Sequence, residues 1–426
     1  MTGSDPVTGG DPVTGGDPAT GSDPVTGGDW VTGSDPATGS DPATGADSVT
    51  GSHPTTGTGR VTGNHPTTGT DPVTGNHPTT ETGRLTGAGV PPGTPRRLRV
   101  PAPVPGARVL GVGAYRPARV VPNSEVAPAI GSSDDWIRRR SGIVTRRFAA
   151  PDETVVEMAA AASLKALAQS GVAPDAVDTV LLASMSLLEQ SPPAAPRVAH
   201  RIGAVAAGAL DVGAACAGFV HALATADSLI RSGNSRHVVV VGAERMSDIV
   251  DPTDRGTAFL FGDGAGAVVV GPADEPGIGP VVWGSEGGRH AAIAHGGPWP
   301  VPGAPVAVTP TLRMDGPAVF RWAVATVPRA ARAALSAAGV HAADLAAFVP
   351  HQANLRIIDG AAAALRLPEQ VVVARDVVHA ANTSAASIPL AMEELLARGA
   401  VPSRGLALLV GFGAGLSHAA QVVSLP

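Results

Sequence analysis

The chain has 426 residues, a formal net charge of -6 and an isoelectric point of about 6.0. No basic stripe stands out, which excludes a typical nucleic-acid-binding protein. No apolar run reaches the roughly 18 to 20 residues that span a bilayer, and the N-terminus lacks the charged start and apolar core of a signal peptide. We therefore expect a soluble, cytoplasmic protein that binds neither nucleic acid nor a membrane.

A six-residue unit recurs from Thr2 to about Thr86, for example as TGSDPV, TGGDPV and, in drifted form, TGNHPT. A repeat of fixed period can be a solenoid, such as a hexapeptide β-helix. Each unit here offers at most one small aliphatic residue and usually a proline, so stacked coils would bury too little apolar surface to offset the entropy of ordering. The repeat and the Pro- and Arg-rich stretch after it therefore predict a disordered tail over residues 1–105.

Strand and helix patterns alternate from residue 106 onward, which predicts an α/β fold. The first strand, residues 107–115, is expected to run into a glycine turn, but Arg116 and Pro117 stand where a dinucleotide-binding loop needs its third glycine. The second part repeats the alternation of the first, so we expect two fused halves, residues 106–275 and 276–426. The expected helices cover residues 134–142, 158–170, 194–202, 219–233, 318–338, 355–365 and 388–398, and the main expected strands cover 177–184, 238–243, 346–349 and 406–410.

Cys216 is the only cysteine of the chain, so it has no partner for an intramolecular disulfide and belongs to no cysteine metal cluster. Small residues flank it, and the helix pattern that follows places it at a helix N-terminus. The positive end of a helix dipole stabilises a thiolate, so we expect a lowered pKa and a nucleophile. A buried free cysteine is as often a small packed hydrophobe, and this stretch alone does not decide between the two.

Two polar loops in the second part offer partners for the thiol. His351 follows the expected strand 346–349 directly, at the edge where α/β sheets place ligand-handling groups, and Asn382 lies in a polar island before an apolar helix. N–H donors of these two side chains can stabilise an oxyanion or an enolate. The alternative for each is a helix cap or a turn residue.

Taken together, the loops resemble the signature segments of the β-ketoacyl-[acyl carrier protein] synthase III family. The resemblance covers about residues 107–426 and leaves the repeat tail outside. It implies a thiolase-like, five-layered α/β/α/β/α fold of two duplicated halves and a homodimer, in which the loop 187–196 shapes the acyl pocket and crosses the dimer interface. The matching segments are DVGAACAGF (211–219), DPTDRGT (251–257), FGDGAG (261–266), VPHQANLRII (349–358) and ANTSAAS (381–387).

The resemblance also implies the chemistry. Cys216, His351 and Asn382 match the catalytic set, with the Cys216 thiolate taking an acyl group from acyl-CoA before malonyl-acyl carrier protein is decarboxylated and condensed with it. Backbone N–H groups of Cys216, Ala414 and Gly415 would bind the thioester oxyanion. No metal is implied, and no cofactor apart from the CoA and carrier-protein thioesters that serve as substrates.

Substrate contacts carry over in the same way. An aromatic face suits the adenine of CoA and guanidinium groups suit its phosphates, while a local basic patch suits an acidic carrier protein. The alternative for the arginines is a solvated face, and Ala363 stands where some members have a basic docking residue. The implied CoA contacts are Trp136, Arg140, Arg255, Gly256 and Asn354, and the implied carrier-protein contacts are Gln352, Ala353, Asn354, Leu355, Arg356 and Arg321.

The resemblance predicts a chain-initiating condensing enzyme of type II fatty acid synthesis. The first alternative is a condensing enzyme or acyltransferase of a specialised, polyketide-type pathway. The second is a tether or binding module defined by the repeat tail, with a passive folded body. A passive body has no reason to keep the full Cys-His-Asn set, so we favour catalysis.

Overall fold

The computed structural model describes residues 100–189, 191–295 and 311–426. The predicted disordered tail therefore lies outside the described residues, except for residues 100–105. Within that short stretch the Val104 N–H donates to the Arg231 carbonyl (3.1 Å), so the chain already contacts the folded body there. None of the described helices is both long enough and apolar enough to cross a membrane.

Each half builds one five-stranded mixed sheet, and the two sheets share one pattern. The strand orders are β5-β4-β6-β7-β1 and β12-β11-β13-β14-β8. In each sheet the first three strands are parallel, and each of the last two is antiparallel to the strand before it. This repetition confirms the predicted duplication. The first sheet consists of β1 (Gly106–Tyr115), β4 (Thr179–Ala183), β5 (Gly208–Val212), β6 (Val238–Glu244) and β7 (Gly264–Ala273), and the second of β8 (Val282–Gly284), β11 (Leu345–Pro350), β12 (Val372–Val373), β13 (Leu406–Gly413) and β14 (Ser417–Ser424).

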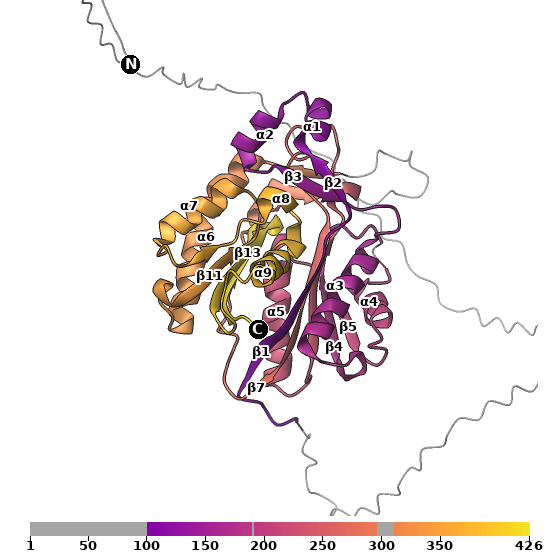
Figure 1. The fold of residues 1–426 in the computed structure, drawn as a ribbon, viewed down its shortest axis with the longest axis vertical. Coiled ribbons are helices and arrows are strands. Elements are labelled where there is room, and N and C mark those ends of the chain that lie inside the picture. Colours follow the sequence, from indigo (N-terminus) through magenta and orange to yellow (C-terminus); the bar gives the residue numbers. More distant parts are fainter. Residues whose placement is uncertain (1–99, 190, 296–310) are drawn as a thin grey trace, which may run out of the picture. The chain divides into compact units, whose positions relative to one another are not determined.

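Helices cover both faces of each sheet and make five layers (Figure 1). The central layer packs against both sheets, and its long helix follows the nucleophile segment directly. The first outer layer is α3 (Val155–Ser170) with α4 (Ala195–Arg201), the central layer is α5 (Gly218–Arg231) with α9 (Ser387–Ala397), and the second outer layer is α6 (Gly316–Ala338) with α7 (Leu355–Leu365).

The predicted glycine turn after the first strand is wrong. Gly111 and Gly113 lie inside β1, which continues to Tyr115. A Cβ on Gly113 would lie 2.2 Å from the carbonyl oxygen of Ala162 in α3. The glycines therefore allow a helix to lie directly on the strand, which is a packing requirement that sequence punctuation does not distinguish from a turn.

Local signals place the helix ends close to their expected positions. The Thr154 hydroxyl accepts from the Glu157 N–H (3.2 Å) at the start of α3, and Gly171, with a φ of 70°, ends it. Helix α7 begins at the cap Asn354, whose side chain accepts from the Arg356 N–H (2.9 Å). Side-chain caps and left-handed glycines are the features that end helices in general.

Smaller elements cover one end of the sheets and were not predicted, apart from the helix at residues 134–142. Among these elements, the helix at residues 134–141 and the strands at residues 293–295 and 312–314 contribute side chains to the cavity described below. These elements are the antiparallel pair of β2 (Arg119–Pro122) and β3 (Thr145–Phe148), the ribbon of β9 (Ile293–His295) and β10 (Leu312–Met314), and the short helices α1 (Asn123–Val126), α2 (Asp134–Ser141) and α8 (Val377–Ala380).

Glycines also bring the two halves into backbone contact. A Cβ on Gly242, in the central strand β6, would lie 2.3 Å from the carbonyl oxygen of Ala385. A Cβ on Gly266 would lie 2.8 Å from the Leu390 nitrogen of α9. The turn that carries Asn382 in the second half is thereby pressed against the strands of the first half.

Candidate active site

Cys216 lies in a 3-10 turn, Ala215–Ala217, between the end of β5 and the first residue of α5, Gly218. The preceding Ala215 has a φ of 44°, which is strained for a residue with a Cβ. Such strain persists only where the surrounding structure holds it, and it is common at functional sites. The turn places the sulfur at the end of the first sheet, facing the second half.

His351 comes from the second half, directly after β11. Its backbone N–H donates to the Val410 carbonyl (2.8 Å), which ties it to the neighbouring strand β13. Its ring Nδ1 contacts the Ser387 hydroxyl (2.7 Å), and the ring packs edge-on against Phe412 at 5.1 Å. The contact at Nδ1 leaves Nε2 as the nitrogen that is available to a substrate.

Asn382 is held by the first half on both sides of its backbone. Its N–H donates to the Leu260 carbonyl (2.9 Å), and its carbonyl accepts from the Gly262 N–H (3.1 Å). Its side-chain Oδ1 accepts from the Ser384 N–H (2.8 Å). Because the oxygen is engaged in this turn, the side-chain NH2 group is the end that is left to donate to a ligand.

The three side chains line one cavity of about 330 Å³. Its walls are mostly apolar, and polar groups are few and convergent, which is typical of small-molecule sites. The structure therefore brings together the three residues that the sequence picked from three separate loops. Besides these three, the lining includes Met185, Phe259, Leu260, Phe261, Ile293, Leu312, Met314, Phe320, Ile357, Phe412 and Gly413.

Burial sets the protonation states of the two titratable groups. It raises the pKa of the Cys216 thiol to about 12, and the negative charge of Glu244 adds to this shift. It lowers the pKa of His351 to about 3. The expected lowered thiol pKa is therefore wrong for the resting protein, because the sulfur sits in a dry pocket before the helix rather than at an exposed helix end. A neutral thiol faces a neutral imidazole.

Gly413 lies against the nucleophile and directly precedes Ala414 and Gly415, the two residues whose backbone is predicted to bind the oxyanion. A Cβ on Gly413 would lie 2.7 Å from the Cβ of Cys216 and 3.0 Å from its sulfur. Gly413 lines the cavity, whereas in the described chain Ala414 and Gly415 are not part of the lining. These contacts do not bear on the backbone N–H groups of Cys216, Ala414 and Gly415, so their role as oxyanion donors stays a prediction.

The residues matched to CoA contacts gather at one side of the cavity. Trp136 packs edge-on against Phe259 (5.0 Å between ring centres), and the guanidinium of Arg255 lies 4.9 Å from the centre of the Trp136 ring. Arg140 is exposed, lines the cavity and lies 5.8 Å from the same ring. Asn354 also lines it, and its side chain donates to the Arg140 carbonyl (3.2 Å). Gly256 completes this group.

The residues matched to carrier-protein contacts do not all reach the surface. Gln352 is buried, and its amide donates to the Pro350 carbonyl (2.7 Å) and accepts from the Val377 N–H (3.1 Å). It has no atom to offer a partner protein, so this assignment is corrected. Leu355 packs against Gly142. Three others line the cavity, namely Ala353, Arg356 and Arg321, and the exposed Arg356 lies 5.2 Å from the ring of Phe320.

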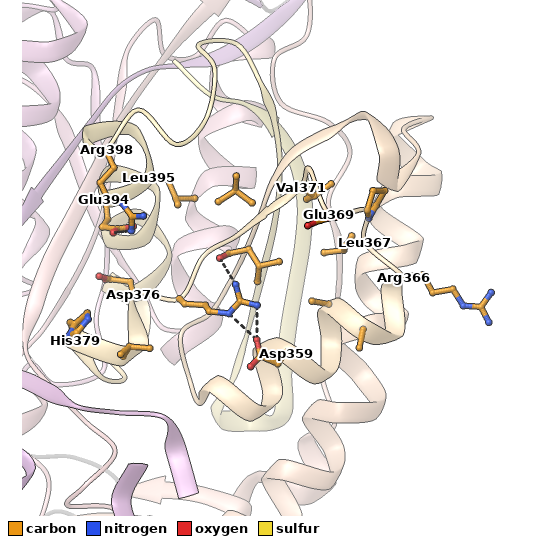
Figure 2. A pocket seen from close by; sticks show the side chains of 17 residues that line it. Asp359, Arg366, Leu367, Glu369, Val371, Asp376, His379, Glu394, Leu395 and Arg398 are labelled. Carbon is orange, nitrogen blue, oxygen red and sulfur yellow. Dashed lines mark hydrogen bonds and ion pairs between the residues drawn. The ribbon is translucent and has the colours of Figure 1, made fainter. Parts of the chain in front are cut away.

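A larger hollow of about 830 Å³ lies beside α7, β12 and α9 and does not carry the chemistry (Figure 2). Two of its basic side chains are paired with acidic neighbours. Arg375 pairs with Asp359 (2.9 Å), and Arg398 pairs with Glu394 (2.6 Å). It lacks the chain's one cysteine, so we place the candidate active site in the smaller cavity.

Two further groups of residues at or near the cavity were not predicted from the sequence. The apolar walls at residues 312–320 lie in a segment without a recognisable motif, and apolar side chains alone do not distinguish a pocket from a core. Glu244, at the end of β6, and Ser384, two residues after Asn382, stand near the sulfur. Ser384 has a φ of 45°, and its position inside the ANTSAAS segment was the one signal that pointed to it.

Comparison with known proteins agrees with this geometry. A family model described as 3-Oxoacyl-[acyl-carrier-protein (ACP)] synthase III matches residues 210–287, and the model for its C-terminal part matches residues 335–425. The β-ketoacyl-[acyl-carrier-protein] synthase III of Streptomyces glaucescens is 52% identical over 323 residues, which cover 76% of this chain and 97% of that protein. The mycobacterial β-ketoacyl-[acyl-carrier-protein] synthase III of Mycobacterium marinum is 48% identical over 319 residues, 75% and 95% of the two chains.

Solved structures of similar proteins point to the same family. The priming β-ketosynthase of the R1128 polyketide biosynthetic pathway superposes with a TM-score of 0.76 at 52% identity, over 78% of this chain and 99% of that chain. The 3-oxoacyl-(acyl carrier protein) synthase III of Pseudomonas aeruginosa PAO1 superposes with a TM-score of 0.69 at 38% identity, over 75% and 98% of the two chains. The chain therefore belongs to the β-ketoacyl-[acyl-carrier-protein] synthase III family, which consists of condensing enzymes of the acyltransferase class.

Proposed function

We propose that this protein condenses an acyl-CoA primer with malonyl-[acyl carrier protein] and so initiates type II fatty acid synthesis. The observation that carries the proposal is the convergence of Cys216, His351 and Asn382, from both halves of the chain, on one largely apolar cavity. A thiol, an imidazole and a carboxamide in that arrangement suit a reaction that passes through an acyl-enzyme and then an enolate.

The first half-reaction moves the acyl group to the protein. His351 accepts the Cys216 proton as the sulfur attacks the thioester carbon, because both groups rest uncharged and a buried thiolate forms best in concert with a base. The carbon–sulfur bond to CoA then breaks, and the departing CoA thiolate takes the proton. The backbone N–H groups of Cys216, Ala414 and Gly415 would stabilise the tetrahedral oxyanion.

The second half-reaction makes the new carbon–carbon bond. Malonyl-[acyl carrier protein] loses CO2, and the electron pair moves into an enolate. In this step the neutral His351 ring would carry its hydrogen on Nε2, with Nδ1 accepting from the Ser387 hydroxyl, so that the enolate oxygen accepts hydrogen bonds from Nε2–H and from the Asn382 NH2 group. The enolate carbon attacks the acyl carbonyl on Cys216 and expels the thiolate. The product is a 3-oxoacyl-[acyl carrier protein], and the Cys216 thiolate takes a proton from solvent to restore the resting pair.

The variant Asn382→Ala tests whether Asn382 acts in the second half-reaction and not in the first. We expect the variant to take up an acyl group on Cys216 at close to the wild-type rate, since the first half-reaction needs no enolate donor. Release of CO2 from malonyl-[acyl carrier protein] should fall by about 10²–10³-fold, the usual cost of removing one preorganised donor. Mass spectrometry of the acyl-protein and a 14CO2 release assay measure the two steps. Wild-type decarboxylation in Asn382→Ala would contradict the role of Asn382.

A specialised pathway is the second candidate, and one finding favours it. The R1128 priming β-ketosynthase is 52% identical to this chain, as similar as the relative from Streptomyces glaucescens. Both candidates use the same two half-reactions and differ in the primer that enters the cavity. A panel of straight and branched acyl-CoAs, scored by the mass of the condensed product, separates them.

We propose further that two copies pair through the edge strand β5. Its outer edge has no strand partner in the described chain, and an unprotected edge favours pairing with another chain. Apolar side chains are exposed beside it, namely Leu188 (59%), Val205 (76%) and Leu210 (46%). Together they offer the apolar surface that a stable dimer buries.

Leu210→Lys tests the pairing. A charge at the centre of the proposed contact should shift the mass in solution from about twice 42.2 kDa toward 42.2 kDa, as measured by light scattering after size exclusion. Leu164→Lys, on the exposed face of α3 (45%), is the matched control and should keep the wild-type mass. An unchanged mass for Leu210→Lys would exclude this interface.

A further inference from the structure

One buried carboxyl near the active site has no part in the two half-reactions above. Glu244 ends β6, is fully buried, and its pKa is raised by that burial. Taking a carboxyl group out of water costs several kcal/mol unless hydrogen bonds replace the lost hydration. The hydrogen bonds of Glu244 must therefore offset the cost of burying its carboxyl group beside the nucleophile.

The two oxygens of Glu244 collect donors from two separate segments. Oε2 accepts from the Ser186 hydroxyl (2.5 Å) and the Ser186 N–H (3.1 Å), and both oxygens are within reach of the Met185 N–H (3.1 and 3.2 Å). Oε1 also accepts from the Ala385 N–H (3.3 Å). The first segment carries Met185 of the cavity wall, and the second is the turn that carries Asn382.

The carboxyl therefore bridges the two halves at the site. Asn382 and Ser384 lie in the turn that Oε1 holds, and the Asn382 amide is oriented by the Ser384 N–H (2.8 Å). The Ser384 hydroxyl stands between the Cys216 sulfur and Glu244 without a well-formed hydrogen bond to either. The left-handed φ of Ala381 (58°) and Ser384 (45°) shows that this turn must be held from outside.

We propose that Glu244 is a positioning residue for the decarboxylating half-reaction, in which its carboxyl holds the Asn382–Ala385 turn in register with the cavity wall at Met185. This inference rests on the proposed function and deepens it. A displacement of about 1 Å at a donor group costs roughly 10²-fold in rate, so the turn needs an anchor as rigid as the strand that supplies it. Acyl uptake on Cys216 does not depend on the Asn382 amide and should be far less sensitive.

Glu244→Gln is the sharpest variant, since it keeps the shape and changes one oxygen into an NH2 group. The oxygen that remains is expected on the side of Ser186, where most donors converge. The NH2 group then faces the Ala385 N–H, donor against donor, and the tie to the second half is lost. We expect acyl uptake from acyl-CoA to stay within a few fold of wild type, while CO2 release from malonyl-[acyl carrier protein] falls by about 10²-fold.

A second measurement distinguishes a positioning role of Glu244 from a general loss of rigidity at the site. Glu244 faces the Cys216 thiol, and the neighbouring Arg245 pairs with Asp248 (3.3 Å). Removing the Glu244 charge should move the pH dependence of iodoacetamide alkylation to lower pH, and labelling reports one thiol because Cys216 is the only cysteine. Asp227→Asn, a buried carboxyl further along α5, is the control and should change neither the ratio of the two steps nor the alkylation profile.

The outcomes are distinct. A selective loss of CO2 release together with the shifted alkylation profile supports the proposal. Equal losses in both steps, or none, overturn it, because Glu244 would then be a folding element or dispensable. If Glu244→Gln does not fold, Ser186→Ala, which removes one donor on the cavity side and keeps the charge, must still show the selective loss. Failure of the wild-type protein to condense at all would instead count against the proposed function.

Discussion

Cys216→Ser is expected to abolish condensation, with a loss of about 10⁴-fold or more, as for other covalent nucleophiles. A serine hydroxyl has a far higher pKa than a thiol and is a poor leaving group when the enolate attacks its ester. The cavity already raises the pKa of the thiol to about 12, so the same dry surroundings would suppress an alkoxide still further.

The measurement is incorporation of radiolabelled acetyl-CoA into the protein. Wild type should carry one label per chain, and Cys216→Ser should carry none, while Asn382→Ala should still be labelled. Because Cys216 is the only cysteine, label that survives in Cys216→Ser would show that another type of nucleophile receives the acyl group. That result would remove the acyl-enzyme from the mechanism.

Gly413→Ala is expected to have the next largest effect, although it adds a single methyl group. The new Cβ would lie 2.7 Å from the Cβ of Cys216 and 3.0 Å from its sulfur, both inside normal contact distance. Neither neighbour is the far end of a flexible chain, so the Cys216 turn must move. A displaced sulfur loses its alignment with the thioester carbon, and we expect acyl uptake to fall by about 10²-fold or more.

The rate of acyl transfer from acetyl-CoA and the melting temperature should be measured side by side. Gly360→Ala is the matched control, because it lies within α7 with open space around its Cα and should keep full activity. A Gly413→Ala variant with wild-type acyl transfer would show that this backbone does not constrain the nucleophile. The effect on activity should exceed any effect on melting temperature.

The fold and the three central residues were within reach of the sequence because their signals are local. Helix α7 occupies the predicted residues 355–365, and α3 and α9 differ from prediction by a few residues at their ends. Cys216, His351 and Asn382 each lie in a short polar or small-residue segment, where a functional role can be inferred without knowing the contacts, and His351 also follows a buried strand directly. The duplication was visible as a repeated alternation of elements.

The features that could not be predicted from the sequence depend on residues that are distant in the chain. The pKa of Cys216 depends on burial by the second half and on the charge of Glu244. The side chain of Gln352 is held inside the protein by hydrogen bonds to two backbone groups, one of which is the Val377 N–H. Its neighbours in the sequence predict that Gly113 is a turn residue, whereas the structure shows that it lets α3 pack closely on β1. Each error came from treating a residue through its chain neighbours alone.

The division of the site between two copies of one architecture has an evolutionary consequence. The first copy supplies the sulfur and the second supplies the imidazole and the carboxamide, while each copy keeps the same order of strands. Neither copy retains the chemistry of the other, so the duplicated units have specialised rather than remained redundant. A single unit of this architecture would hold only part of the Cys-His-Asn set, so the reaction requires both units in contact.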